Sequence, residues 1–180
     1  MKLIPVVNNG KTIYKCDCYN EIYEDLPLCF GVDAPASYYS VPEHERKNRI
    51  ELEKSLCIID KKYFFHRGRL TIPILNYDQS LFFDVWTSIS EENFERRIDL
   101  WEDPDRVNEP PYFGWLNTFI PSYGNTINLK TITQETELGA IPHIIMTEES
   151  HPLTIDQQNG ITMDKALDII SDALAHNHKA

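Results

Sequence analysis

Two cysteines near the start of the chain have the side-chain type and spacing that come nearest to a metal site. Cys16 and Cys18 flank Asp17 in a Cys-x-Cys pair. Structural zinc sites normally use Cys-x-x-Cys, with a second pair elsewhere. Cys29 and Cys57 are isolated, and they complete a four-sulfur site only if the fold brings all four together. We therefore predict no bound metal and no cofactor, and we expect Cys57 to be a small buried hydrophobic residue.

Histidine is the other side chain that could do acid–base or metal chemistry, and the chain has six. None of them occurs in a His-Glu-x-x-His pattern. His66 stands beside Arg67 and Arg69, and a small-molecule site or an enzyme of unknown reaction could use these three near Tyr112 and Trp115. The simpler interpretation of His66 is a structurally hydrogen-bonded or solvated side chain.

Phosphate-binding and nucleophile motifs do not occur in the sequence. There is no Gly-x-Gly-x-x-Gly, no Gly-x-x-x-x-Gly-Lys and no Gly-x-Ser-x-Gly. Catalytic triads are defined in space, so an enzyme is not excluded, but no spacing supports one. We predict no catalytic residues.

The charge distribution is more informative than these motifs. The net charge of −11 argues against a nucleic-acid surface, which is normally basic. Carboxylates concentrate in the segment after residue 90, and such faces usually only interact with water. They also suit docking onto a basic protein. The candidate partner-binding residues are Glu91, Glu92, Glu95, Asp99, Glu102 and Asp103.

The element that must position these carboxylates is a predicted helix after Ser90, which follows a predicted β-hairpin. Apolar residues alternate over 70–74 and 83–89, as in strands with one buried face. Ser90 has the side chain of a helix N-cap. Phe94, Ile98 and Trp101 recur at helical spacing and predict the face that packs on the sheet. We also expect Trp86 to be buried against Phe94 or Trp101.

The rest of the chain predicts a single α+β domain with a largely antiparallel sheet and helices packed on it. Residues 1–30 are expected to form a knuckle-like hairpin region and residues 31–180 the core. Further helices are predicted over 43–55, 153–159 and from 163 onward, and further strands over 56–60, 126–133 and 141–147. No segment has the apolar length of a membrane span, so we expect a cytoplasmic protein.

A set of short segments occurs in consistent order along most of the chain: Leu26-Pro27-Leu28, Cys57-Ile58-Ile59-Asp60, Phe64 to Pro73, Trp86 to Ser90 with Asn93-Phe94, Pro121-x-Tyr123, His151-Pro152-Leu153 and Gly160-Ile161-Thr162. With these segments the chain resembles the bacterial family of uncharacterised proteins catalogued as domain of unknown function 2199. The resemblance implies no established activity. Relatives often carry Cys-x-x-Cys-Gly and then His near the start. Here Cys16 matches, but Tyr19, Asn20 and Tyr23 replace the other three.

Two functional hypotheses follow from the sequence. The first is a non-enzymatic protein-binding module, in particular an immunity-type inhibitor that docks on a basic toxin or another basic protein. The second is the small-ligand binder or enzyme that uses His66. A cleft that brings His66, Arg67 and Arg69 together near Tyr112 and Trp115 would favour the second hypothesis. An exposed acidic face would favour the first.

Overall fold

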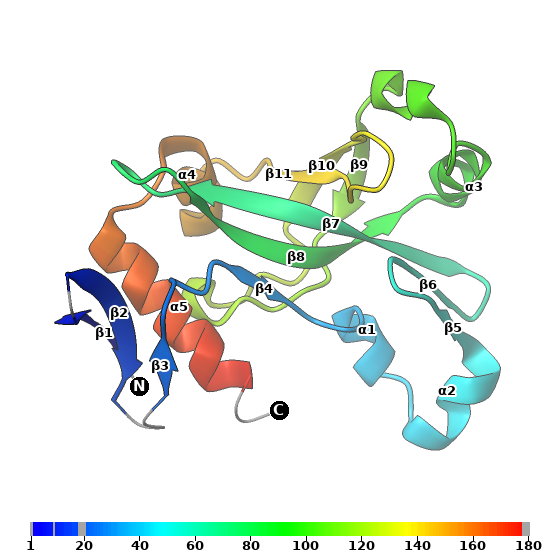
Figure 1. Cartoon of the computed structure of the whole chain (residues 1–180). Helices are drawn as coiled ribbons and strands as arrows, with labels where there is room; N and C mark the ends of the chain where they lie inside the picture. Colours follow the sequence, from blue (N-terminus) through cyan, green and yellow to red (C-terminus); the bar gives the residue numbers. More distant parts are fainter. Residues whose placement is uncertain (1, 9, 18–20, 178–180) are drawn as a thin grey trace.

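A long antiparallel hairpin, formed by β7 (Tyr63–Pro73) and β8 (Ser80–Ile89), runs through the centre of the molecule (Figure 1). The computed structural model describes residues 2–8, 10–17 and 21–177. Period-two alternation decides the two faces of the hairpin. Leu70 and Ile72 on β7 lie opposite Phe83 and Leu81 on β8, and all four are buried in the main core. The predicted strand faces are therefore confirmed.

The main sheet extends from this hairpin in the order β4-β8-β7-β11-β10-β9. The added strands are β4 (Cys29–Gly31), β9 (Tyr112–Trp115), β10 (Lys130–Gln134) and β11 (His143–Met146). Most pairs are antiparallel, but β4 pairs β8 and β11 pairs β7 in parallel. The far strand β9 curls back to β8, where Thr87 and Leu116 form an antiparallel bridge. The curled sheet therefore encloses an inner face.

Glycine permits this return of β9. A β-carbon at Gly114 would meet the carbonyl oxygen of Ser88 on β8. The backbone N–H of Trp115 donates to Ser88 Oγ at 2.9 Å, and the N–H of Asn117 donates to the Trp86 carbonyl at 2.7 Å. Only a residue without a side chain allows the two backbones to approach this closely.

The N-terminal region forms a separate small sheet of three strands, β1 (Leu3–Asn8), β2 (Lys11–Cys16) and β3 (Ile22–Tyr23). It lies against α5 (Met163–Asn177), the long helix near the C-terminus (Figure 1). The backbone N–H of Leu3 donates to Ser171 Oγ at 2.8 Å. Within this region β1 and β2 form an antiparallel hairpin, and β3 pairs with β2.

The helical part of residues 43–55 is shorter than predicted. After α1 (Ala36–Tyr39), the helix α2 covers only Glu43–Arg49, and β5 (Ile50–Leu52) then pairs with β6 (Leu56–Ile59). Arg49, the last residue of α2, pairs with Glu45 one turn earlier and with Asp60 just after β6. Strand pairing with β6 therefore ends the helix at Arg49.

Trp86 is fully buried, as predicted, but its expected neighbours are wrong. It packs with Val41, Cys57, Ile59 and Phe65 in a second, smaller core. Its Nε1–H donates to the Val32 carbonyl at 3.0 Å. Trp86 lies on the face of β8 opposite to Thr87, and this face is covered by the α1–β6 segment rather than by the helix after Ser90.

Two helices close the inner face at the end of the hairpin. α4 (Pro152–Asn159) ends at Gly160, whose φ of +76° favours glycine. α5 is capped by Thr162, whose Oγ1 accepts a 3.3 Å hydrogen bond from the Lys165 N–H. The strand predicted over 126–133 begins only at Lys130. In the described part of the chain, no helix is long and apolar enough to cross a membrane.

Candidate functional site

The candidate carboxylates are carried by α3 (Glu91–Asp99) and by the segment that follows it. Ser90 caps this helix, since its Oγ accepts from the Asn93 N–H at 3.2 Å. Five of the six candidates are exposed: Glu91, Glu92, Glu95, Asp99 and Glu102. Asp103 is half-buried, and its side chain accepts from the Asp105 N–H at 2.9 Å to cap η1 (Pro104–Asn108). Asp103 therefore has a structural partner within the chain.

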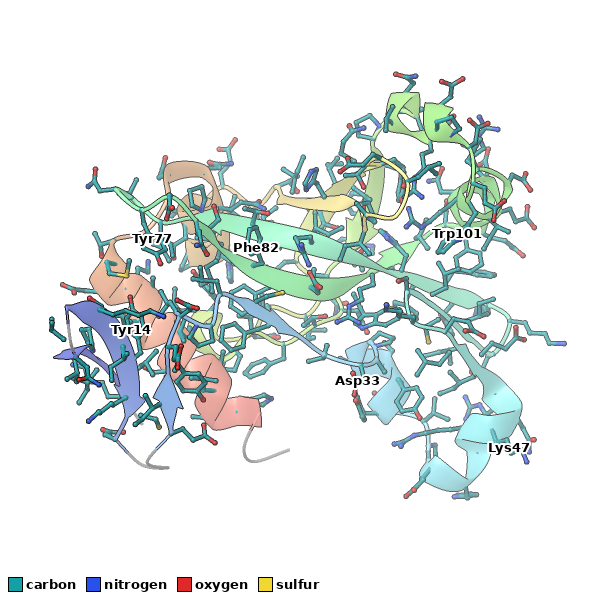
Figure 2. All side chains as sticks on the ribbon, viewed as in Figure 1. Tyr14, Asp33, Lys47, Tyr77, Phe82 and Trp101 are labelled. Atoms are coloured by element: carbon teal, nitrogen blue, oxygen red, sulfur yellow. The ribbon has the colours of Figure 1, made fainter. Side chains whose placement is uncertain are left out.

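Two apolar side chains are exposed among these carboxylates. Ile98 and Trp101 are each 45 % exposed, and Trp101 is labelled in Figure 2 close to α3. The prediction that both face the sheet is wrong. The helix ends at Asp99, so Trp101 does not continue the helical phase, and the buried side of α3 contains Phe94 and Arg97 instead. We name Glu91, Glu92, Glu95, Ile98, Asp99, Trp101 and Glu102 the α3 surface.

Beneath α3 lies a buried polar group that the sequence analysis did not identify. Arg97 and Arg106 both bind the carboxylate of Glu135, Arg97 through Oε1 and Arg106 through Oε2 at 2.9 Å. The Tyr112 hydroxyl donates to Oε1 at 2.7 Å. Burial and the negative charge of Glu135 raise the pKa of Tyr112, so this hydroxyl keeps its proton.

The sequence does contain a signal for this group. Arg97 follows Phe94 by three residues, which places both on the inward side of α3. Glu135 continues the alternation of the buried Thr131 and Thr133 on β10. A charged residue at an inward position needs a partner of opposite charge. The inward positions of Arg97 and Glu135 therefore indicate that each has a buried counter-charge.

A cavity of about 40 Å³ lies over this group. The lining residues come from α3, η1 and its exit, β9 and the end of β10: Asn93, Arg96, Arg97, Leu100, Arg106, Glu109, Pro110, Tyr112 and Glu135. Arg96 pairs with Glu109 at 2.6 Å on its outer side. The cavity is therefore polar and charged, with an apolar wall at Leu100 and Pro110.

His66 lies deeper on the inner face and is fully buried. Its Nε2 is 2.8 Å from Thr87 Oγ1 and 3.3 Å from Thr133 Oγ1, and its ring centroid is 5.6 Å from that of Tyr112. Burial, together with the positive charge of Arg97, lowers the pKa of His66 to about 3. The neutral ring is thus part of the hydrogen-bonded core, in line with the simpler interpretation.

The structure does not bring together the group proposed around His66. Arg67 and Arg69 point from the opposite face of β7, and Arg69 binds Asp84 at 2.8 Å on that face. Trp115 lies on the outer face of β9, where its ring meets that of Phe113 at a centroid distance of 5.0 Å. Of the four expected neighbours, only Tyr112 lies close to His66.

The cysteines can be placed only in part. Cys16 is buried at the end of β2, and Cys57 is fully buried in the smaller core, as predicted. Cys18 lies outside the described residues. Among the residues that the structure describes, no group of three or more His, Cys, Asp or Glu side chains is arranged to hold a metal ion.

The model of a protein family described as "Uncharacterized protein conserved in bacteria (DUF2199)" matches residues 15–161. The chain belongs to the DUF2199 family. The DUF2199 match includes the central hairpin, α3 and every residue that lines the cavity, whereas α5 follows it. The resemblance noted in the sequence is therefore confirmed. No curated protein and no solved structure matches the chain.

Proposed function

We propose that this DUF2199 protein is a cytoplasmic, non-enzymatic binding module that docks on a basic protein through the α3 surface. The observation that carries the proposal is that Ile98 and Trp101 are exposed and are surrounded by the carboxylates of the α3 surface. Exposed tryptophan is a frequent anchor of protein interfaces, and surrounding charges raise association rates and select partners of opposite charge.

The arrangement of charge on α3 supports a cationic partner. Glu91, Glu95 and Asp99 follow one another at intervals of four residues, so their carboxylates lie along one side of the helix. Like charges at this spacing destabilise a helix by a few tenths of a kcal/mol per pair. A basic partner relieves this repulsion, which adds to the attraction across the interface. In its most specific form, the proposal is that the partner is a toxin and that docking neutralises it.

The partner is identified first, by a photo-crosslinking amino acid placed at Ile98 in cells and, as a control, at Ile155, an exposed apolar residue of α4. A protein crosslinked from position 98 and absent from position 155 is then purified for binding kinetics. We expect a protein with a basic surface.

Charge reversal tests the site with a matched control. Glu91→Lys/Glu95→Lys reverses two exposed carboxylates four residues apart on α3. Asp164→Lys/Asp168→Lys makes the same change on α5, where both residues are also exposed. We expect the α3 pair to slow association about tenfold or more and to weaken its salt dependence, because steering by complementary charge acts on the on-rate. Equal effects of the two pairs, or no effect of either, contradict the proposal.

A further inference from the structure

We propose that the cavity between α3, η1 and β9 is a binding site for a small monocarboxylate. This site is separate from the α3 surface, since its lining residues are Arg97, Arg106, Tyr112 and Glu135 with their neighbours. A single buried water needs about 10–15 Å³ of such space. The cavity of about 40 Å³ therefore has room for a group of a few non-hydrogen atoms.

The charges that line the cavity do not balance. Arg96, Arg97 and Arg106 contribute three positive charges, and Glu109 and Glu135 contribute two negative charges. Arg96 and Glu109 neutralise each other. Two buried guanidinium groups then share the single carboxylate of Glu135, with side chains 3 %, 6 % and 5 % exposed. One buried positive charge is left over, and a bound monoanion would neutralise it.

Hydrogen-bond donors are also in excess at this site. Each guanidinium group has five N–H donors, whereas the carboxylate of Glu135 has two oxygens. Tyr112 already donates to one of these oxygens. The Nε of Arg97 is buried and has no hydrogen-bond partner among the residues that the structure describes. A buried donor without a partner is costly, so the carboxylate of Glu135 does not satisfy all the donors of this group.

The chemistry of the lining favours a carboxylate over a phosphate dianion. Arginine binds carboxylates and phosphates alike through two parallel N–H···O bonds, so the choice between them depends on the other lining and nearby residues. Leu100 and Pro110 offer an apolar wall for a short alkyl group. Near the rim, the hydrogen bonds that Arg96 donates to Glu109 and the negative charges of Asp99 and Asp103 raise the pKa of Arg96. These nearby acids disfavour a second negative charge on the ligand.

Binding is tested by titrating the whole protein with butyrate while recording ¹H–¹⁵N spectra. Butanamide serves as the neutral control of the same shape, and inorganic phosphate as the dianion. We expect saturable shifts at the amides of Asn93, Arg97 and Tyr112, with a Kd of about 1 mM or tighter, which is reasonable for so small a ligand. Absence of saturable shifts with butyrate, or equal binding of butanamide, overturns the proposal. Tighter binding of phosphate than of butyrate overturns the choice of a monocarboxylate.

Two variants must change the affinity in opposite directions. Glu135→Gln removes the competing carboxylate and should lower the Kd for butyrate about tenfold, whereas Arg106→Gln removes the surplus charge and should raise it about tenfold. Arg69→Gln, which alters an arginine–carboxylate pair on the opposite face of β7, is the control and should leave the Kd unchanged. If Glu135→Gln or Arg106→Gln is unfolded, the direction of the change in Kd in the other variant still tests the proposal. A Kd for butyrate that is the same in the wild type and in each folded variant contradicts the assignment.

Discussion

Arg97 and Glu135 form a buried ion pair although they are 38 residues apart in the sequence. Arg97 comes from the inward side of α3, and Glu135 directly follows β10. Their side chains are almost completely removed from solvent, and Arg106 and Tyr112 complete the coordination of the carboxylate. Through Arg97 and Arg106, the carboxylate of Glu135 therefore fixes α3 and η1 to the inner face of the curled sheet.

The first prediction concerns this ion pair. Glu135→Gln keeps the side-chain volume but leaves two buried guanidinium groups without a counter-charge, so it should lower the free energy of unfolding by about 3–5 kcal/mol. Urea unfolding followed by circular dichroism measures this loss. Glu109→Gln is the matched control, because Glu109 pairs with the solvent-exposed Arg96, and it should change the stability only slightly. Equal losses in the two variants would show that burial of the pair has no energetic role.

The second prediction concerns pH and His66. The folded-state pKa of about 3 lies below the ordinary value of 6.5, so the unfolded chain takes up the proton first as the pH falls. This group therefore stabilises the fold above pH 6.5, and its contribution is lost progressively as the pH falls from 6.5 toward 3. Between pH 7 and pH 5 the loss should be about 2 kcal/mol.

The measurement is the free energy of unfolding of the wild type and of His66→Gln at several pH values. Carboxylates titrate in both proteins, so only the difference between the two curves reports His66. We expect the two curves to converge as the pH falls from 7 to 5. Parallel curves would mean that His66 titrates alike in the folded and unfolded states.

The third prediction compares two tryptophans. Trp86→Ala removes a fully buried side chain and the hydrogen bond to the Val32 carbonyl, and it should cost about 3–5 kcal/mol. Trp101→Ala removes an exposed ring and should cost much less. Thermal or urea unfolding distinguishes the two. A large loss from Trp101→Ala would mean that this ring is held in the fold and is not available to a partner.

The fourth prediction tests the return of β9 to β8. Gly114→Ala places a methyl group against the Ser88 carbonyl, so the strands must separate and the stability should fall by about 1–3 kcal/mol. The Asn117 N–H, which donates to the Trp86 carbonyl, should then exchange with solvent faster than in the wild type, and hydrogen-exchange measurements detect this loss of protection. Phe113→Ala, on the outer face of the same strand, should leave the protection of that N–H unchanged.

Local pattern in the sequence determined the central hairpin, the cap and start of α3, and the last two helices. Each of these depends on contacts within a few residues: period-two alternation over 70–89, the Ser90 side chain on the Asn93 N–H, and Gly160 after α4. Each of these signals lies within a short stretch of sequence, so it can be interpreted without knowing how the rest of the chain folds. The acidic character of residues 91–103 was equally visible.

The tertiary structure decided the candidate site. Whether Trp101 is buried depends on where α3 ends, and whether residues 50–52 extend a helix or form a strand depends on pairing with β6. The partners of Arg97 come from η1, β9 and β10, because the sheet curls until these segments meet. Periodicity could show that Arg97 and Glu135 face inward. Which charge each one meets was decided by packing between elements far apart in the chain, since a buried charge is stable only where the fold supplies its counter-charge.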